Sequence, residues 1–587
     1  MVHVRPRSQS HWLAVVLVLF CAASDAHAFK FGPKDSLEVR GKVYTQFTVA
    51  TEESQEYTQP EINPGDMKQW RTFYNPEFEV DFRRLLGAQS WIDELEGRVA
   101  VWGFYDGIYD FGPERYAQNL EKTRNTRNTV GADAQAAFYS WGRSTAAALQ
   151  NRGQRRDGRE FYGRRVRVNE AYVDVAKGPF FARIGRQAIS WGEADTVGLL
   201  DANNPFDTLI QPGLLMDLDE ARIPLWTLRT TYELFSVWGP LSSGFLEGYW
   251  VPGSIDVDVG YLNVQGVSPY SQPPPLQAPA IQVFDKLPEY GMDHSRWGIK
   301  FQTVIQRDYN FSVWFYRTFQ LVPVPIIAGI SEPLSPTLPG YVTTILNHEP
   351  NNVWGAAMSW YSDRLDSIVR TELELFQEEL SFLAYRAIGA PVQSGFQQPG
   401  TLERANILRG EFGFDKNFFL PLVNPSASFL AVMSIVFEAN LDETDNKDFR
   451  TPLIKPSAIE RELAGGLTAG QNAGPSCDNK NAPPPDAPGL SRCDFINQDP
   501  IEAFAQTTLR SDFMHGNLSP ALTAIATFRG ALTFAPSVVY RWSDNVLLDA
   551  KYVNTHTFGS GDNGYTKGVG LNRDRDQFWV RATFQLN

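Results

Sequence analysis

The feature that most constrains this chain is an alternation of apolar and polar side chains, which recurs in windows of about ten residues. In the last window, Phe578 and Val580 alternate with Trp579 and Arg581. Successive side chains of a β-strand point to opposite faces, so this period predicts strands with one apolar and one polar face. No stretch after residue 28 has the ~18 consecutive apolar residues of a membrane-spanning helix. The chain is therefore expected to be all-β.

Eighteen alternating windows can be placed along the sequence, although sixteen would also satisfy the pattern. An even number of antiparallel strands brings both ends of the chain to the same side of the sheet. The expected strands are 36–49, 77–85, 95–106, 165–176, 180–189, 224–235, 244–262, 295–305, 310–320, 351–361, 367–378, 404–414, 426–439, 502–512, 518–529, 531–542, 546–556 and 576–587.

The connections between these windows alternate in length. Turns such as 177–179 and 543–545 take every second place, and long loops take most of the others, the largest being 107–164 and 440–501. This arrangement is typical of a transmembrane antiparallel β-barrel with short periplasmic turns, long extracellular loops and both termini on the periplasmic side. In hydrocarbon, a closed sheet also pairs every backbone N–H and C=O without apolar helices.

Residues 1–28 have the three parts of a secretory signal peptide. Arg5 and Arg7 precede an apolar run over 13–23, and Ala26 and Ala28 are the small residues of a cleavage site. The run is shorter than the ~20 apolar residues of a membrane helix, which favours cleavage before residue 29. We therefore expect residues 29–587 to form the barrel, located in the outer membrane of a Gram-negative bacterium.

Composition and motif content exclude several functions. The chain carries 53 Lys and Arg against 67 Asp and Glu, and this net charge of −14 predicts no nucleic-acid partner, because such binding needs clustered cations. The sequence lacks the motifs of nucleophile-elbow hydrolases, zinc peptidases and P-loop nucleotidases, so no enzymatic activity is expected. We also expect no metal and no cofactor, because the histidines after the signal peptide are scattered without ligand spacing: His294, His348, His515 and His556.

Cys477 and Cys493 are the two cysteines that follow the signal peptide. In an exported chain, two cysteines within a stretch rich in Pro, Asn and Asp predict a loop disulfide. Closing this loop would stabilise the folded state by about 3 kcal/mol through the entropy of the unfolded chain.

Membrane lipid decides which face of each strand points outward. A shift of one residue would place Arg and Lys side chains in hydrocarbon, at about 2–4 kcal/mol each near the midplane. Several such residues would exceed the ~5–15 kcal/mol that stabilises an ordinary domain. The polar faces are therefore expected to line a wet lumen, with these candidates: Arg229, Glu233, Lys300, Arg370, Glu372, Glu374, Arg409, Glu411, Asp549, Lys551 and Arg581.

The segment 190–222 is long and rich in carboxylates, and it follows a basic strand end. If this loop folds into the barrel, opposite charges would face each other across a constriction, and the field between them would filter solutes. A salt-bridge network that only holds the loop in place explains the same residues equally well. Strand parity puts Arg183 and Gln187 on one face, and Arg186 on the other unless Gly185 marks a bulge. The candidate constriction residues are Arg183, Arg186, Gln187, Trp191, Glu193, Asp195, Asp201 and Asp207.

The same region carries a family resemblance. It contains Arg-Ile-Gly-Arg-Gln at 183–187, Trp-Gly-Glu at 191–193 and Asn-Pro at 204–205. In these motifs the chain resembles the proteobacterial outer-membrane family called domain of unknown function 1302 (DUF1302). The resemblance implies a porin-like outer-membrane β-barrel from a family associated with uptake or export of hydrophobic compounds. It carries over no catalytic or ligand-binding residue.

The leading functional expectation is a porin-like channel that conducts small solutes, with hydrophobic compounds as candidates. Its partners would be outer-membrane lipid, lipopolysaccharide and the solute. The alternative is a non-conducting surface barrel whose loops 107–164 and 440–501 bind a partner, or a barrel that docks a periplasmic partner or an export system. These loops hold 58 and 62 residues, which is more than a simple pore requires.

Overall fold

The structure is a computed structural model. The predicted signal peptide at 1–28, Cys477 and Cys493, and most of the loops 107–164 and 440–501 lie outside the residues that it describes. The described residues are 29–53, 62–86, 91–114, 116–117, 162–192, 202–207, 218–258, 281–286, 288, 290–320, 324–330, 342–380, 404–442, 453–454, 495–496, 501–528, 530–558 and 575–586.

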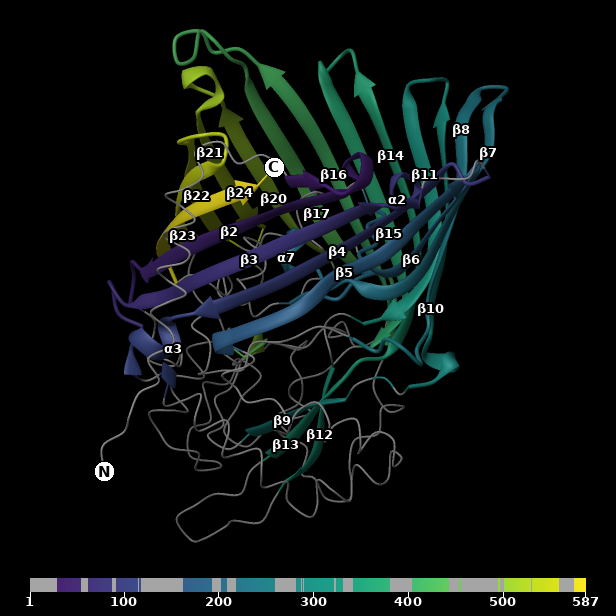
Figure 1. Ribbon diagram of the computed structural model, residues 1–587. Helices are drawn as coiled ribbons and strands as arrows, with labels where there is room; N and C mark the ends of the chain where they lie inside the picture. The colour runs from purple at the N-terminus through teal and green to yellow at the C-terminus, as the bar shows by residue number, and fades with distance from the viewer. Residues whose placement is uncertain are drawn as a thin grey trace, which may run out of the picture.

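Eighteen antiparallel strands form one closed ring (Figure 1). The ring closes where β24 (Gln577–Leu586) pairs with β2 (Leu37–Ala50). A further short strand, β1 (Phe29–Phe31), pairs with the start of β2 on the edge that β24 occupies further along. The all-β barrel of eighteen strands that the alternation predicted is therefore confirmed.

The other strands of the ring follow in chain order, and each pairs with its neighbours. They are β3 (Met67–Asp81), β4 (Glu94–Asp106), β5 (Arg164–Lys177), β6 (Phe180–Gln187), β7 (Leu225–Trp238), β8 (Leu241–Val251), β10 (Arg296–Ile305), β11 (Tyr309–Phe319), β14 (Pro350–Ser362), β15 (Ser367–Leu380), β16 (Arg404–Phe418), β17 (Phe429–Asn440), β20 (Ile501–Ser511), β21 (Leu518–Thr527), β22 (Ala531–Arg541) and β23 (Val546–Thr557).

Short connections lie on one side of the ring, except for the three residues that join β21 to β22 on the other side. Two residues join β5 to β6, two join β7 to β8, and three join β10 to β11. Figure 1 shows these turns at the top of the barrel, whereas the long connections leave from the opposite side. β2 begins and β24 ends on the turn side, as the alternation of connection lengths predicted. We refer to the two sides as the turn side and the loop side.

Two strands differ from their predicted positions. The strand predicted at 244–262 corresponds to β8, which begins at Leu241 and ends at Val251, before Pro252, which has no N–H to donate to the ladder. The sequence predicted a strand at 77–85, whereas β3 begins at Met67 and ends before the short helix α2 (Phe82–Leu86). A proline inside a run argues against a strand because it has no N–H to donate to the ladder. The wall accommodates Pro76 because the β3–β4 pairing passes over it and Gly41 of β2 stands opposite.

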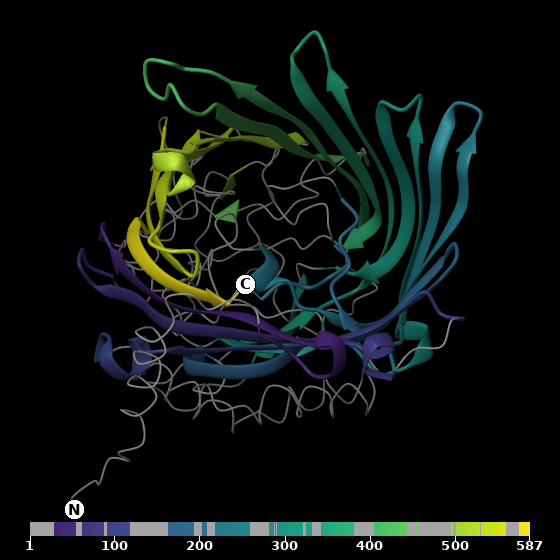
Figure 2. The same ribbon diagram turned by 45° about the horizontal axis from the view of Figure 1, so that its top comes forward.

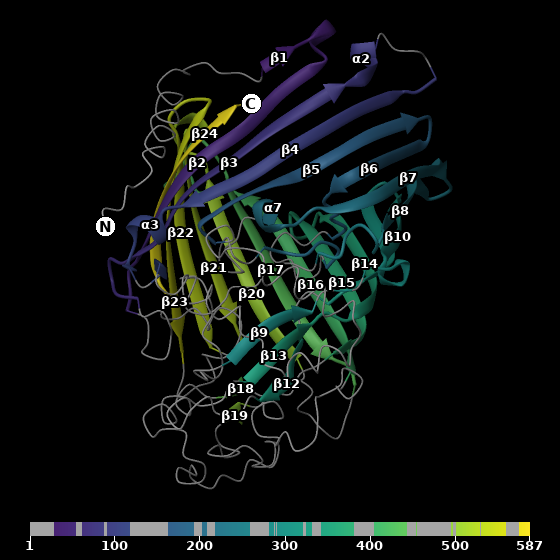
Figure 3. The ribbon, with the colours of Figure 1, turned by 60° about the horizontal axis from the view of Figure 1, so that its bottom comes forward.

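The smaller elements lie in the connections. Next to the barrel, on its loop side, β13 pairs antiparallel with β12 and parallel with β9 (Figure 3). None of the helices in the described ranges is long and apolar enough to cross a membrane. The smaller helices and strands outside the ring are η1 (Pro33–Asp35), α3 (Ile108–Phe111), α7 (Leu218–Ala221), β9 (Ile281–Lys286), η4 (Met292–His294), β12 (Val324–Ile330), β13 (Val342–Asn347), β18 (Leu453–Ile454), β19 (Phe495–Ile496) and η7 (Met514–Gly516).

The pairing register separates an apolar outer face from a polar inner face. Glu372 of β15 stands opposite Glu411 of β16, and the next residue, Leu373, stands opposite Gly410. Glu372 is 2% exposed, whereas Leu373 is 47% exposed. Exposed apolar residues on an outer wall are stable only against another apolar phase, which for a closed barrel is membrane hydrocarbon.

Candidate functional site: the lumen and its internal loop

The chain leaves the wall after β6 and turns into the lumen at Trp191. This side chain is 2% exposed, and its ring packs against Tyr249 of β8 with a centroid distance of 4.9 Å. Its indole N–H donates to Glu247 Oε1 at 2.7 Å. Gly298 of β10 leaves the space for the ring, because a Cβ at that position would lie 2.8 Å from it. Trp191 therefore attaches the start of the loop to the inner wall.

The Asn-Pro turn holds the loop against the same wall. Tyr249 Oη donates to Asn203 Oδ1 at 2.5 Å, and Thr318 Oγ1 of β11 donates to the Ala202 carbonyl at 3.0 Å. Asn204 accepts the Ile189 N–H at 2.7 Å and donates to the Ile223 carbonyl at 2.8 Å. Its side chain thus connects the outgoing and returning parts of the loop.

The loop is also attached to strands at the N-terminal end of the ring. Asp207 is fully buried and pairs with Arg165 and, at 3.7 Å, with Arg167 of β5. Glu220 of α7 accepts from Lys42 Nζ at 2.8 Å and from Tyr44 Oη at 2.7 Å. Figures 2 and 3 show α7 inside the ring. Buried carboxylates are stable only when they are paired, so these contacts define where the loop can lie.

Arginines of β3 and β5 lie against aromatic rings of β4. The Arg165 and Arg167 guanidinium groups lie 5.3 and 4.1 Å from the Trp102 ring of β4, and Arg71 of β3 lies 4.4 Å from the Phe104 ring. Cation–π contacts of this kind stabilise each pair by about 0.5–2 kcal/mol. The inner wall from β3 to β5 is therefore cationic on its loop side.

The predicted constriction residues do not form one ring. Trp191 and Asp207 belong to the internal loop described above. Gln187 is fully buried and donates to the Arg183 and Thr227 carbonyls at 3.1 Å each. Arg183 lies nearer the turn side and makes two 2.7 Å bonds to Asp174. The other predicted members Glu193, Asp195 and Asp201 lie outside the described residues.

Arg186 lies on the other face of β6. The β5–β6 and β6–β7 pairings run through Gly185 without a register shift, so Arg186 does not share the inner face with Arg183. It pairs with Asp256 at 3.8 Å. Gly185 does not mark a bulge, so Arg186 points to the face of β6 opposite to that of Arg183 and Gln187.

The candidate lumen residues of β7–β16 form paired networks. Arg229 pairs with Glu247 at 2.8 Å, and Arg370 pairs with Asp415 at 3.0 Å. Glu374 accepts from Trp314 Nε1 at 3.0 Å and Tyr316 Oη at 3.2 Å. Further contacts complete this half of the wall: Arg409 with Glu379 and Glu438 at 2.8 and 2.9 Å, Lys300 5.7 Å from the Trp314 ring, and Glu233 with Ser236 at 2.6 Å.

The inner wall formed by β22–β24 is more accessible toward the turn side. Asp549 and Lys551 are neighbours on the inner face of β23, and both are half-buried. Arg581 of β24 stands opposite Asp549 and donates to Gln46 at 2.8 Å. These three groups are charged members of the predicted lumen set that are not fully buried.

The family model described as "Protein of unknown function (DUF1302)" matches residues 10–586. The chain belongs to this family. The match covers nearly the whole sequence, so the resemblance inferred from the Arg-Ile-Gly-Arg-Gln, Trp-Gly-Glu and Asn-Pro residues is confirmed. In the structure, the Trp and Asn of these motifs attach the internal loop of this DUF1302 protein.

Solved outer-membrane proteins also resemble this DUF1302 barrel. They include OccAB4 of Acinetobacter baumannii (7% identity, TM-score 0.40, covering 94% of this chain and 98% of that one) and OccK1 (OpdK) of Pseudomonas aeruginosa (9%, 0.39, 94% and 100%). A loop-deletion mutant of OmpT of Vibrio cholerae is a third (6%, 0.33, 94% and 98%). The curated proteins include no match. Likenesses this remote assign no solute, because one fold carries many functions.

Sequence reasoning missed several residues of the site. Glu247 lay in a predicted strand and alternates with Leu246 and Gly248, so parity alone could have placed it in the lumen. Glu220 gave no such signal, because its partners Lys42 and Tyr44 lie more than 170 residues away. Within the described ranges, no group of three or more His, Cys, Asp and Glu residues could hold a metal ion.

Proposed function

We propose that this DUF1302 protein is an outer-membrane channel for small solutes in which loop 190–222 narrows the lumen. One observation carries the proposal: the loop is bound to strands far apart around the ring. Ala202 is held by β11 and Glu220 by β2, and β11 is the ninth strand counted from β2 in a ring of eighteen. A segment attached to nearly opposite walls crosses the space between them.

The charges on the two walls support a filtering role. The β5 wall carries Arg165 and Arg167, which pair with Asp207 of the loop, whereas the β15–β16 wall carries the buried carboxylates of Glu372, Glu374 and Glu411. In a lumen with low-dielectric walls, opposite charges on facing surfaces create a field across the path of a solute. Polar solutes would be oriented by this field as they pass the loop.

The aromatic side chains beside the loop hold it to the wall and do not line a free path, because each is at most 6% exposed. Trp191, Tyr249, Trp314 and Tyr316 form one buried cluster with aliphatic neighbours. Hydrophobic compounds are the proposed solute class because the DUF1302 resemblance implies them.

Planar-bilayer recording of the purified full chain tests the channel. We expect stepwise ion conductance, and we expect the double variant Asp207→Ala/Glu220→Ala to raise the unit conductance by freeing the loop. The variant Ser236→Ala, outside the loop contacts, serves as the control. A correctly folded protein that stays electrically silent would rule out an open pore.

A docking function is the second candidate, and one turn favours it. The turn between β16 and β17 exposes four apolar residues on the turn side: Phe419, Leu420, Leu422 and Val423. Lys416 precedes them on the outward face of β16, where a charged residue marks the edge of the hydrocarbon. Under this candidate, photo-crosslinking from position 422 in cells yields an adduct with an inner-membrane export protein, and the barrel does not conduct.

A further inference from the structure

The barrel wall has a notch where β6 and β7 end on the loop side. β5 pairs with β4 over Arg164–Ala176 but with β6 over Ala171–Lys177 only. β6 ends at Gln187, opposite the first residue of β7, Leu225. Within the described part of the chain, no strand continues the ladder beside residues 164–170 of β5 on this edge.

The notch lies at the level of the membrane. Val166 and Val168 belong to the part of β5 that extends past β6, and they are 65% and 47% exposed. On the other flank, Trp250 of β8 and Trp297 of β10 are also exposed on the outer face. Because apolar side chains point outward on both flanks, the notch lies within the part of the wall that membrane hydrocarbon covers.

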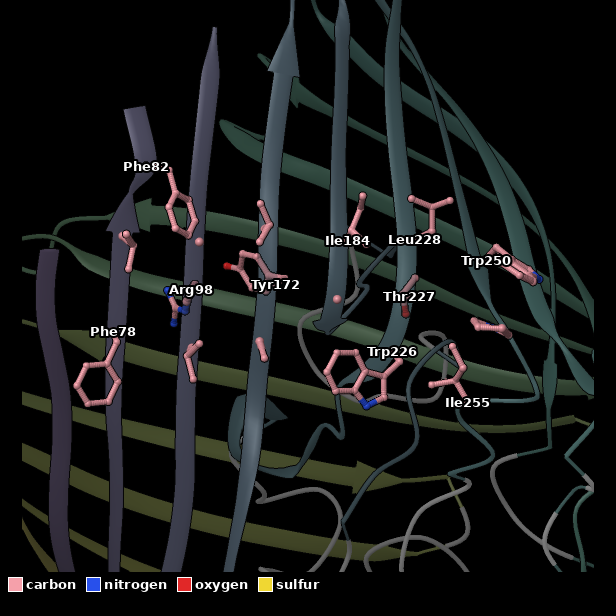
Figure 4. A pocket seen from close by; sticks show the side chains of 17 residues that line it. Phe78, Phe82, Arg98, Tyr172, Ile184, Trp226, Thr227, Leu228, Trp250 and Ile255 are labelled. Atoms are coloured by element: carbon pink, nitrogen blue, oxygen red, sulfur yellow. The ribbon is translucent and has the colours of Figure 1, made fainter. Parts of the chain in front are cut away.

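An apolar groove of about 590 Å³ runs along the outer face to this notch (Figure 4). Its lining residues come from β3 to β8 and from the segment after β8. Small residues, Gly97 and Ala171, lie between the larger side chains of Phe78 on one flank and Ile184 and Leu228 on the other. Figure 4 shows Trp226 and Ile255 at the end of β6, where the notch begins.

An ion pair stands at this end of the groove. Arg186 of β6 pairs with Asp256 at 3.8 Å, and Asp256 also accepts the backbone N–H of Trp226 at 2.9 Å. β7 pairs with β8 only from Leu228 onward, so Asp256 takes the place of a ladder partner for Trp226. The segment after β8 is thus held over the notch by side-chain contacts instead of a continuous sheet.

We propose that the notch is a lateral portal through which an elongated hydrocarbon chain, such as that of a free fatty acid, moves between the lumen and the membrane, with the apolar groove as its binding site. The proposal rests on the proposed channel function. The groove spans six adjacent strands, or ~24 Å at the usual strand spacing, which suits an extended chain better than a compact solute. The Arg186–Asp256 pair is the closure of the portal.

Uptake of radiolabelled hexadecanoic acid tests the portal, in Gram-negative cells that lack their own long-chain fatty-acid transporter and produce the full chain. Leu228→Trp and Ile184→Trp fill the groove, and we expect each to reduce uptake severalfold. Asp256→Ala removes the closing pair, and we expect it to increase uptake severalfold. The matched control is Leu373→Trp, which adds the same side chain at an exposed outward leucine of β15.

Planar-bilayer conductance is measured on the same variants, and the heat-modifiable gel shift of folded barrels confirms that each is folded. We expect conductance to stay unchanged in Leu228→Trp, Ile184→Trp and Leu373→Trp. Normal uptake by the two groove variants, or an equal loss in Leu373→Trp, would overturn the portal. Conductance without any uptake by the wild-type protein would overturn the portal and leave the channel standing, whereas absent conductance would refute the channel itself.

Discussion

At the scale of single residues, Trp191 shows how a glycine on one element determines the position of another. The indole ring occupies the space above Gly298, where the inner wall has no side chain, and donates to Glu247. The sequence placed Trp191 in a candidate constriction because it belongs to the segment 190–222, but it could not identify the partners of Trp191, because Glu247 and Gly298 lie on strands 56 and more residues away. Contacts of this kind depend on the closed ring and not on local sequence.

We expect Trp191→Ala to lower the stability of the barrel by ~3–5 kcal/mol, the usual effect of removing a large buried aromatic side chain. The loop should also detach and the conductance should become noisy. Thermal unfolding in detergent, followed by the heat-modifiable gel shift, measures the first effect and single-channel recording the second. Trp191→Phe keeps a ring but loses the bond to Glu247, so its stability should lie between that of the wild type and that of Trp191→Ala. A Trp191→Ala protein as stable as wild type would show that the ring does not anchor the loop.

The inner face of β23 allows a charge test with a matched pair. Asp549 and Lys551 have opposite charges, and both are half-buried on the same inner face. Asp549→Asn should shift ion preference toward anions, and Lys551→Gln should shift it toward cations. Reversal potentials in a salt gradient measure both shifts. If the two variants moved the potential in the same direction, the passage would not run along β23.

At the scale of elements, the strands were predictable, whereas the contacts that hold loop 190–222 were not. Alternation locates a strand wherever lipid lies on one side and water on the other, which is the case around this ring. It failed at β3, where Pro76 obscured a strand that begins at Met67. The course of loop 190–222 depends on Glu220 meeting Lys42 of β2, a pairing that no local pattern encodes.

The turns also contact one another, and one such contact predicts a pH effect. Asp93, in the β3–β4 connection, accepts the Gly178 N–H at 2.6 Å, and this bond together with nearby Lys177 lowers the pKa of the Asp93 carboxyl. A lowered pKa stabilises the folded state above the unfolded value of about 3.9, and this stabilisation is lost as pH falls through the folded value.

We therefore expect the thermal stability of the wild type to fall more steeply than that of Asp93→Asn between pH 5 and pH 2. Asp93→Asn should match the wild type most closely at the acidic end, where the carboxyl is protonated in both states. Unfolding temperatures in detergent across this range are the measurement. Parallel curves for the two proteins would show that the contact between the turns does not affect stability.

At the scale of the whole molecule, the ring closes by ten residue pairs between β2 and β24, with β1 continuing the same edge of β2. On the loop side, the inner wall is cationic at β3–β5, where Arg71, Arg165 and Arg167 lie, and the wall at β15–β16 is rich in buried carboxylates. The division requires the closed barrel, because its two sides come from the distant segments 67–177 and 367–418. Composition gave only a net charge of −14 and no indication of this separation.

The attachment of one loop to both β2 and β11 has a mechanical consequence. A thin-walled cylinder embedded in a fluid under lateral pressure tends to flatten into an ellipse. Here the described parts of the loop, 202–207 and 218–223, are joined by the Phe206–Arg222 bridge and connect the two walls. Their buried polar contacts resist changes in the separation of the two walls. Thicker or stiffer bilayers should therefore leave the cross-section of this barrel nearly unchanged.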